Sequence, residues 1–276
     1  MRINANIAAL NAARNLNMSQ DALGKSLEKL SSGYRINRAA DDAAGLAISE
    51  GLRSEIRGSS QAQRNAQDGI SFLQTAEGSL NEVSSMLQRM RELAVQAANS
   101  TSDGTAEQAE TTALTTEITA VGARTKFSGI SVFQDYSAVG KALNFQVSSN
   151  SAAAEQVQVN SNLTLAATAI GGVDLTAINL TTDAGAQAAL DTLDTAIKAV
   201  SSERAGLGAT QNRLEHTVAN LGVAVENLTA SESRSRDVDM ASEMATYTRN
   251  NILSQAGTAM LAQANQVPQS VLQLLR

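Results

Sequence analysis

The sequence predicts a mainly α protein, in which long antiparallel helices form a coiled-coil rod with a small β-hairpin region in the middle of the chain. Three observations support this fold class. Apolar residues recur at alternating spacings of three and four, which is the heptad rhythm of packed helices. The 276 residues include a single proline, which permits long unbroken helices. Aromatic residues make up only 3%, which favours thin helical layers over a thick core.

The first apolar stripe runs from the N-terminus to Gly33, a residue type that commonly ends helices. A charged segment, Ser31–Asp42, then interrupts the rhythm. Asp41 and Asp42 stand just before Ala43, where acidic residues favour the first turn of a new helix. The stripe of the first helix contains Ile3, Ile7, Leu10, Leu23, Leu27 and Leu30.

The second helix should be long, because its heptad rhythm continues to the polar cluster Asn99–Gly104. A weaker third helix is expected over Ala106–Thr125, closed by Phe127–Gly129. Beyond it, apolar and polar residues alternate on both sides of a turn cluster, which predicts a β-hairpin within about 130–180. The alternating apolar residues are Leu143, Phe145, Val147, Val157 and Val159. Residues 173–180 are ambiguous, and another short strand is one option.

Helical rhythm returns over residues 188–228 and is most regular in its second half. A polar and charged segment, Ser231–Asp237, is expected to interrupt it. A last helix follows, carries Met244 and Met260 on its apolar stripe, and should stop near Pro268.

The simplest packing pairs the first helix with the last, so that the two charged interruptions lie at similar height. They would then form a joint between two layers. The predicted domains are residues 1–42, an outer domain of residues 43–234 that includes the β region, and residues 235–276, which pair with 1–42.

A heptad helix buries only a narrow stripe, so the paired ends should need other copies to complete their core. Identical chains that contact each other through different surfaces form an open helical polymer when the rotation does not close. A closed dimeric or trimeric coiled coil also fits the pattern and stays open as an alternative.

Little in the sequence supports catalysis. With no cysteine and a single histidine, His216, the chain lacks the residues of a His-paired metal site or a Ser–His–Asp triad. His216 fits a surface or seam position. Asp41 with Asp42, and Asp237 with Asp239, fit helix starts and ion pairs with nearby arginines better than acid–base pairs. These arginines are Arg35, Arg38, Arg234 and Arg236. We expect no enzyme activity and no cofactor.

Composition also bears on partners and localisation. The net charge of −6 disfavours nucleic-acid binding. The chain contains no apolar run of about 18 residues, which is the length needed to span a membrane. The N-terminal segment lacks the uninterrupted apolar stretch of a cleavable signal, so the chain is expected either to stay inside the cell or to leave it by another route.

Several long motifs resemble one family, the bacterial flagellins. They occur in the same order at both ends of the chain, over about Met1–Phe133 and Ala188–Arg276. The short middle fits family members that lack large variable outer domains. The motifs are MRINANIAALNAARNLN, KLSSGYRINRAADDAAGLAIS, LQRMRELAVQAANST and SQAGTAMLAQANQVPQSVLQLL.

The resemblance implies a secreted structural subunit that polymerises into the extracellular flagellar filament for swimming motility. In this family the terminal helices form the inner coiled-coil tube, here about Met1–Ser32 and Val238–Arg276. The charged interruptions become spokes that contact neighbouring subunits. The implied spoke residues are Arg35, Arg38, Asp41, Asp42, Arg234, Arg236 and Asp237.

The resemblance also implies partners: the type III export apparatus, a chaperone on the C-terminal segment, and the filament cap and hook–filament junction proteins. Host Toll-like receptor 5 is a further implied partner. The matching residues are Gln88, Arg89, Glu92, Leu93, Gln96 and Glu110. From the residues alone, Leu93 equally fits a core position, and Arg89 and Glu92 a solvated face. Alternative functions are a hook–filament junction protein, an intracellular coiled-coil adaptor and an enzyme embedded in the filament.

Overall fold

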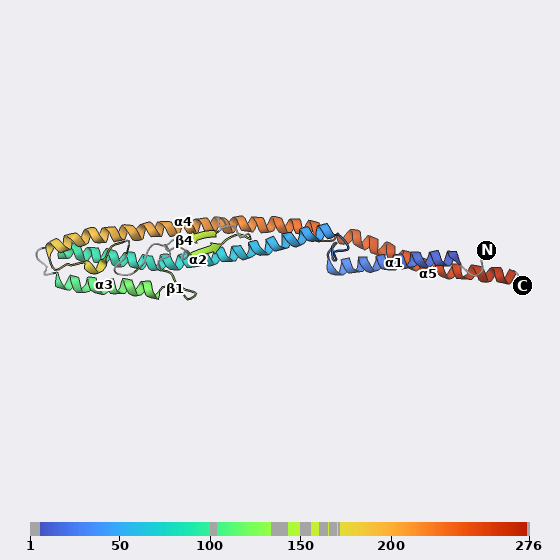
Figure 1. The fold of residues 1–276 in the computed structure, drawn as a ribbon, viewed down its shortest axis with the longest axis horizontal. Coiled ribbons are helices and arrows are strands. Elements are labelled where there is room, and N and C mark those ends of the chain that lie inside the picture. Colours follow the sequence, from blue (N-terminus) through green and yellow to red (C-terminus); the bar gives the residue numbers. More distant parts are fainter. Residues whose placement is uncertain are drawn as a thin grey trace. The chain divides into compact units, whose positions relative to one another are not determined.

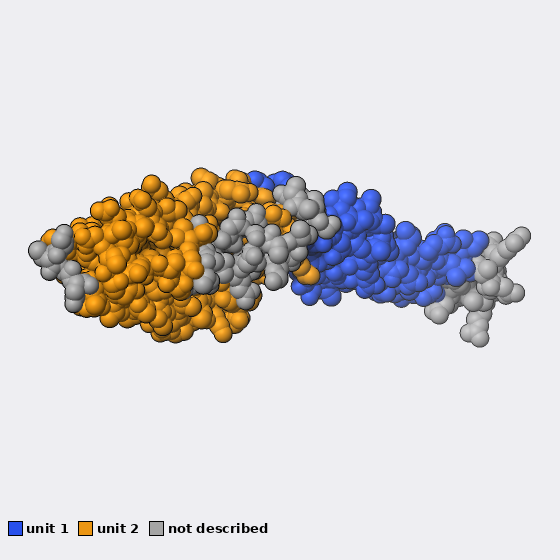
Figure 2. All heavy atoms as spheres, turned by 60° about the vertical axis from the view of Figure 1, so that its left-hand side comes forward, with its two compact units in different colours: residues 1–55, 227–276 blue, residues 56–226 orange. Residues whose placement is uncertain are grey.

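The computed structural model describes residues 6–99, 104–133, 143–149, 156–159, 165, 170 and 172–274. The chain forms two compact units, one of residues 1–55 and 227–276 and one of residues 56–226 (Figure 2). Two long helices, α2 (Ala43–Ala97) and α4 (Asp183–Arg236), contribute to both units (Figure 1). The predicted mainly α fold with a small hairpin is confirmed. The two units divide inside α2 and α4, after residues 55 and 226. The expected domain boundaries after residues 42 and 234 stay a prediction.

The first unit contains helix α1 (Ile7–Ser32) and helix α5 (Met240–Leu274), which lie side by side and antiparallel. Asn6 begins α1, because its Oδ1 accepts a hydrogen bond from the backbone N–H of Ala9 at 3.1 Å. Gly33 ends α1 in the left-handed conformation, with φ of 77°. Its N–H donates to the carbonyl of Lys29 at 2.9 Å. The predicted helix end at Gly33 is therefore confirmed.

The expected interruption at Ser231–Asp237 is wrong over most of its length. Residues 231–236 continue α4, and only Asp237–Asp239 separates α4 from α5. Serine, glutamate and arginine cost little in an exposed helix, and Arg234 and Arg236 suit the negative end of the helix dipole. Asp239 then starts α5, because its Oδ1 accepts from the N–H of Ala241 at 3.0 Å.

The expected stop near Pro268 is also wrong, since α5 continues to Leu274. A proline has no N–H to donate to the carbonyl four residues earlier, which here belongs to Ala264. The side-chain amide of Asn6 donates to that carbonyl instead, at 2.8 Å. A donor from α1 thus replaces the hydrogen bond that Pro268 removes, which helps α5 to continue.

In the second unit, α2 pairs antiparallel with α4 around one hydrophobic core. Ion pairs fix the direction: Arg91 of α2 meets Asp194 at 2.6 Å, and Glu77 meets Arg204 at 3.7 Å. The most completely buried side chains repeat at heptad spacing along both helices. They include Leu73, Leu80, Val83, Leu87 and Met90 from α2, and Leu193, Val200 and Leu214 from α4.

Helix α3 (Thr105–Arg124) lies antiparallel along α2, with Arg89 paired to Glu110 and Ser79 bonded to Thr125. A tight hairpin of β1 (Lys126–Phe127) and β2 (Ile130–Ser131) follows. Its turn residues Ser128 and Gly129 have φ of 49° and 83°, as a type I′ turn requires. The sequence pattern predicted only a helix end there.

The predicted mid-chain hairpin is confirmed. Strands β3 (Leu143–Gln146) and β4 (Gln156–Val159) pair antiparallel, with Phe145 opposite Val157. The ring of Phe145 lies 6.1 Å from that of Phe72 on α2. The apolar strand residues therefore join the core of the second unit.

Residues 173–180 form no further strand. They contain the short 3-10 helix η2 (Leu175–Ala177), capped by the side chain of Asp174. The amide of Gln108 on α3 holds the end of this segment. Its Nε2 donates to the carbonyl of Ile178 at 3.1 Å, and its Oε1 accepts from the N–H of Leu180 at 2.7 Å. The apolar side chains of this segment are buried, so their spacing serves packing and not strand pairing.

Candidate subunit-contact site

The contact between α1 and α5 is built mainly from small residues. The half-buried residues of both helices recur at spacings of three and four, which marks the sides that face each other. The helices approach closely at Gly257, where a β-carbon would lie 3.2 Å from Cδ1 of Leu16. The half-buried positions include Ala9, Ala12, Leu16, Ser19, Ala22 and Leu23 on α1, and Asn250, Ser254, Gly257, Leu261 and Ala264 on α5.

Large apolar side chains of the same helices point away from this contact. Ile7 is 65% exposed and Leu10 is 62% exposed on α1, and Ile252 is 60% exposed on α5. A self-sufficient helix pair would do the reverse, burying its largest apolar groups. We call this set the outer apolar residues: Ile7, Leu10, Met18, Leu27, Met240, Met244, Ile252, Leu253 and Met260.

The predicted seam residues divide between these two groups. Leu23 and Leu30 are half-buried, whereas the other described ones are exposed, and Ile3 lies outside the described residues. The exposed ones are Ile7, Leu10, Leu27, Met244 and Met260. The seam prediction rested on side-chain size and so did not include the small residues between the helices. Their own repeat of Ala, Ser and Gly was the signal that could have revealed them.

Three of the outer apolar residues of α5 also line a shallow groove of about 540 Å³. Met244, Ile252 and Leu253 form its apolar wall, together with Ala245 and the stems of Thr248 and Arg249. A groove along an exposed helix face suits the side chains of another helix.

The two chain breaks meet in the first unit, as predicted. Tyr34 and Asp237 form an antiparallel β-bridge. The N–H of Arg35 donates to the carbonyl of Arg236 at 2.7 Å, and the N–H of Val238 donates to the carbonyl of Gly33 at 3.0 Å. Backbone hydrogen bonds thus tie the end of α1 to the start of α5.

Arg236 is a well-enclosed charged side chain of this joint, at 11% exposed. Its Nη1 lies 2.8 Å from Oε1 of Glu50 on α2, and its guanidinium lies 4.8 Å from the ring centroid of Tyr34. The hydrogen bond from Arg236 lowers the pKa of Glu50 below its ordinary value. The arginine therefore links three segments of the joint.

The acidic residues of the first break bind backbone groups. Oδ2 of Asp41 accepts from the N–H groups of Arg38 and Asn37, and these two bonds lower its pKa. Oδ1 of Asp42 accepts from the N–H of Gly45 at 2.9 Å and so caps α2. The predicted helix-start role is confirmed for Asp42, whereas Asp41 closes the loop before it.

Within one chain, the described aspartates of the joint do not form the expected ion pairs with nearby arginines, whereas pairing between copies stays a prediction. Among the described residues, Arg38 pairs with Glu28 at 2.8 Å, and Arg236 pairs with Glu50. The remaining side chains form hydrogen bonds within the joint. Arg35 donates to the carbonyl of Ser235, Arg234 donates to the hydroxyl of Ser231, and Asp237 accepts from the hydroxyl of Ser233. The acidic partners lie on the helices that flank the break, because the aspartate oxygens already bind backbone amides.

The residues implied in receptor recognition lie on α2 and α3 of the second unit. Nε of Arg89 lies 2.8 Å from Oε1 of Glu110, and its Nη1 lies 3.2 Å from Oε2 of Glu92. The bond to Glu110, followed by the bond to Glu92, raises the pKa of Arg89. Gln88 and Gln96 are exposed, whereas Leu93 is 2% exposed and belongs to the core.

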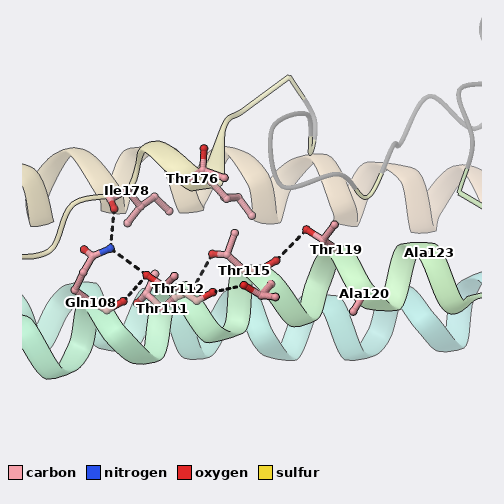
Figure 3. Close-up of a pocket in the computed structure, with 11 residues that line it drawn as sticks. Gln108, Thr111, Thr112, Thr115, Thr119, Ala120, Ala123, Thr176 and Ile178 are labelled. Carbon is pink, nitrogen blue, oxygen red and sulfur yellow. Dashed lines mark hydrogen bonds between the residues drawn. The ribbon is translucent and has the colours of Figure 1, made fainter.

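A second hollow, of about 450 Å³, lies between α3 and the segment around η2 (Figure 3). Threonines line it, and most of their hydroxyls bond to helix carbonyls: Thr115 to Thr111 and Thr119 to Thr115. The hollow is therefore lined largely by methyl groups. The hydroxyl of Thr111 is buried and has no partner among the described residues.

Two further findings concern chemistry and membranes. Within the described residues, no cluster of three or more His, Cys, Asp or Glu side chains is placed to hold a metal ion. None of the helices described has both the length and the apolar character needed to cross a bilayer. His216 is exposed on α4, which confirms the surface position expected for it.

Comparison with known proteins identifies the family. Residues 3–138 match the bacterial flagellin N-terminal helical region, and residues 190–275 match the bacterial flagellin C-terminal helical region. The chain belongs to the bacterial flagellin family. A flagellin of Bacillus subtilis is 51% identical over 307 aligned residues, and one of Halalkalibacterium halodurans is 51% identical over 280. Each alignment covers both chains completely, so this is a short-form flagellin.

Another relative of this flagellin, from Treponema phagedenis, is named a flagellar filament 33 kDa core protein. It is 47% identical over 289 aligned residues, and the alignment again covers both chains completely.

Proposed function

We propose that the chain is a structural subunit that polymerises into the bacterial flagellar filament for swimming motility. One observation carries this proposal: the terminal helices pack small residues against each other and leave large apolar residues exposed. Such a surface is costly in water and gains stability when other chains cover it. The family supports the same reading, since a relative of similar length is named as a filament core protein.

The arrangement favours an open polymer over a closed dimer. The exposed groups lie on both terminal helices and on more than one side, because the adjacent exposed residues Ile252 and Leu253 of α5 project about 100° apart around the helix axis. A single two-fold partner would cover one patch, whereas different surfaces that contact each other add further copies and form an open helix when the rotation between copies does not close. In the polymer, residues 1–42 and 235–276 form the inner layer, and residues 43–234 form the outer one.

The joint is proposed as the spoke between these layers and as a contact with neighbouring subunits. Its proposed contact residues are Arg35, Arg38, Asp41, Asp42, Arg234, Arg236 and Asp237. Support comes from their position at the meeting point of the two breaks. The guanidinium of Arg38 is largely exposed, so a neighbour could reach it.

Partners follow from the same exposed surface. Before assembly, the outer apolar residues of α5 need cover, which supports an export chaperone on the C-terminal segment. Secretion through the type III apparatus to the extracellular filament, and growth between the junction and cap proteins, belong to this proposal. So does the absence of an enzymatic role.

Recognition by host Toll-like receptor 5 is proposed for the exposed set Gln88, Arg89, Glu92, Gln96 and Glu110. This proposal is supported by the exposure of these side chains on α2 and α3 and by the ion pairs that hold Arg89 in place. Leu93 takes a different role, since its buried side chain positions the helix from the core.

Seeded polymerisation tests the proposed function. Full-length subunit is mixed with short polymer seeds, and elongation is followed by light scattering and electron microscopy. Ile252→Ser should abolish elongation while leaving the second unit folded by circular dichroism, because Ile252 is 60% exposed and is not part of the hydrophobic core of that unit. Ile252→Leu, which keeps the apolar surface, should elongate like the parent. Small closed particles from the parent chain, or unchanged elongation of Ile252→Ser, would contradict the proposal.

A further inference from the structure

The sulfur atoms of this chain are distributed unevenly between its two units. There is no cysteine, so the seven methionines hold every sulfur atom. On α2, Met90 is fully buried and Met86 packs partly against the core of the second unit. On α1 and α5 of the first unit, Met18 is 63% exposed and Met260 is 64% exposed, with Met240 and Met244 about half exposed.

These exposed methionines belong to the outer apolar residues. Met244 forms part of the wall of the groove on α5, beside Ile252 and Leu253. Leucine or isoleucine would supply the same apolar area, but only methionine adds a thioether that oxidants attack. With no thiol in the chain to react first, a peroxide meets these sulfurs as its main soft nucleophiles.

We propose that Met18, Met240, Met244 and Met260 form a reversible oxidation site through which peroxides block polymerisation of the free subunit. In each step a sulfur lone pair attacks one peroxide oxygen. The O–O bond breaks and an S–O bond forms. After proton transfer the other oxygen leaves as water from hydrogen peroxide, or as an alcohol from an organic hydroperoxide. The sulfur loses two electrons and becomes a sulfoxide, and the peroxide is reduced. This inference rests on the proposed function, because it concerns the surface that neighbouring subunits cover.

The sulfoxide changes what the surface can do. It replaces an apolar thioether by a strongly polar S=O group. When a neighbouring subunit covers that group, it loses its hydrogen bonds to water unless a donor replaces them. The groove wall around Met244 is mostly apolar, with Ile252 and Leu253 beside it. The hydroxyl of Thr248 already donates to the carbonyl of Met244, which leaves the guanidinium of Arg249 as the donor on this chain that lines the groove. Oxidation therefore opposes assembly without disturbing the core of the second unit.

Two consequences separate this site from general oxidative damage. The same methionines should become protected once the subunit enters the polymer, since neighbours cover them. Enzymatic reduction by methionine sulfoxide reductase, with a dithiol as reductant, should also restore polymerisation. In that step the dithiol becomes a disulfide and the sulfoxide oxygen leaves as water.

The test treats full-length free subunit and preformed polymer with hydrogen peroxide and measures oxygen gain at each methionine by peptide mass spectrometry. In the free subunit, the four sites should react about tenfold or more faster than Met90, which reacts only when the core opens. In the polymer, their rates should fall towards that of Met90. Equal rates at Met90 and the four sites in the free subunit, or no protection in the polymer, would overturn the proposal.

Function is tested on the treated subunit and on a variant that carries Met18→Leu, Met240→Leu, Met244→Leu and Met260→Leu. Leucine conserves volume and apolar character but has no sulfur to oxidise. The elongation rate of this variant after peroxide is therefore compared with its own rate before peroxide, and the two rates should be equal. The oxidised parent should lose at least half of its elongation rate and regain it after reductase treatment. If untreated parent and oxidised parent elongate equally, the oxidation site is refuted while the proposed function stands. If untreated parent does not elongate, the proposed function itself fails.

Discussion

The hydroxyl of Thr111 on α3 is buried, with the residue 1% exposed, and has no hydrogen-bond partner among the described residues. An unpaired buried polar group costs about 1–3 kcal/mol. We therefore predict that Thr111→Val raises the free energy of unfolding by about 1 kcal/mol, because a methyl group of similar shape has no bond to lose. Urea denaturation of the full-length subunit measures the change.

Thr115 supplies the matched control for this prediction. Its hydroxyl is also buried but donates to the carbonyl of Thr111 at 2.9 Å. Thr115→Val should therefore leave stability unchanged or lower it. Equal destabilisation by the two substitutions would show that the hydroxyl of Thr111 is satisfied after all.

The ion pair between Arg91 and Asp194 predicts a pH dependence in the second unit. The hydrogen bond and charge of Arg91 lower the pKa of Asp194 below its ordinary value of 3.8. A lowered carboxyl pKa contributes stability that is complete above the unfolded-state value and is lost as pH falls through the folded-state value. The stability difference between the parent and Asp194→Asn should thus be constant from pH 7 to 5 and shrink towards pH 3.

Urea denaturation at each pH measures this difference. Asp191→Asn is the control, because Asp191 is exposed on the same helix and makes no ion pair in the described part of the chain. The difference in the free energy of unfolding between Asp191→Asn and the parent should stay near zero from pH 7 to 3. A difference for Asp194→Asn that grows on acidification would reverse the sign of the argument.

Single residues of the joint show where sequence reasoning succeeds. The capping role of Asp42 could be predicted, because it depends on local sequence alone. The acidic partners of the arginines could not. Glu28 reaches Arg38 across ten residues, and Glu50 reaches Arg236 across 186. Such pairs depend on how helices pack, which one sequence does not specify.

At the scale of elements, Asn6 couples the start of α1 to the last turns of α5. Its Oδ1 caps α1, and its Nδ2 supplies the carbonyl of Ala264 that Pro268 leaves without a donor. Asn6→Asp keeps the cap acceptor and removes the donor, so it should destabilise the polymer by about 1 kcal/mol per subunit. Thermal melting of the polymer, followed by circular dichroism, measures this change.

A double-mutant cycle with Pro268→Ala isolates the coupling. Alanine restores the backbone N–H that the carbonyl of Ala264 needs, so Asn6→Asp should cost much less in the Pro268→Ala background. Additive effects of the two substitutions would show that the amide of Asn6 does not replace the missing donor.

Helices and strands were predicted well where the apolar periodicity was long. They were predicted poorly where a polar segment was taken as evidence of a break in a helix. The long helix α2 and the end of α1 at Gly33 followed from sequence, as did the β3–β4 hairpin. The segment Ser231–Arg236 looked like a break because it is polar, yet polar residues also form exposed helix. Pro268 looked like a stop, yet a side chain distant in sequence satisfies the carbonyl it frees.

At the scale of the whole molecule, burial differs between the two units. The second unit buries a continuous apolar core between α2, α3 and α4. In the first unit, Ser26 is the one buried side chain among those described on α1 and α5. The heptad pattern predicted the helices of both units equally well, because it shows which side of a helix is apolar. It does not show what covers that side. The need for neighbours could thus be inferred from sequence, but not which residues face them.

This contrast predicts where a protease cuts the free subunit. Helices without a covered apolar face open locally at low free energy. Trypsin should therefore cleave first at Arg14 and Lys25 on α1 and at Arg249 on α5. Lys198 on α4 is the matched control, since it is also exposed but lies on a helix whose other face is buried. Mass spectrometry of early digestion products identifies the order of cleavage.

Polymerisation should reverse this order, because neighbouring subunits cover the outer apolar residues and stabilise both terminal helices. In preformed polymer, cleavage at Arg14, Lys25 and Arg249 should slow strongly, while cleavage at Lys198 changes little. Early cleavage at Lys198 in the free subunit, ahead of the terminal sites, would mean that the terminal helices are stable alone. The exposed apolar surface would then no longer explain why the chain needs copies of itself.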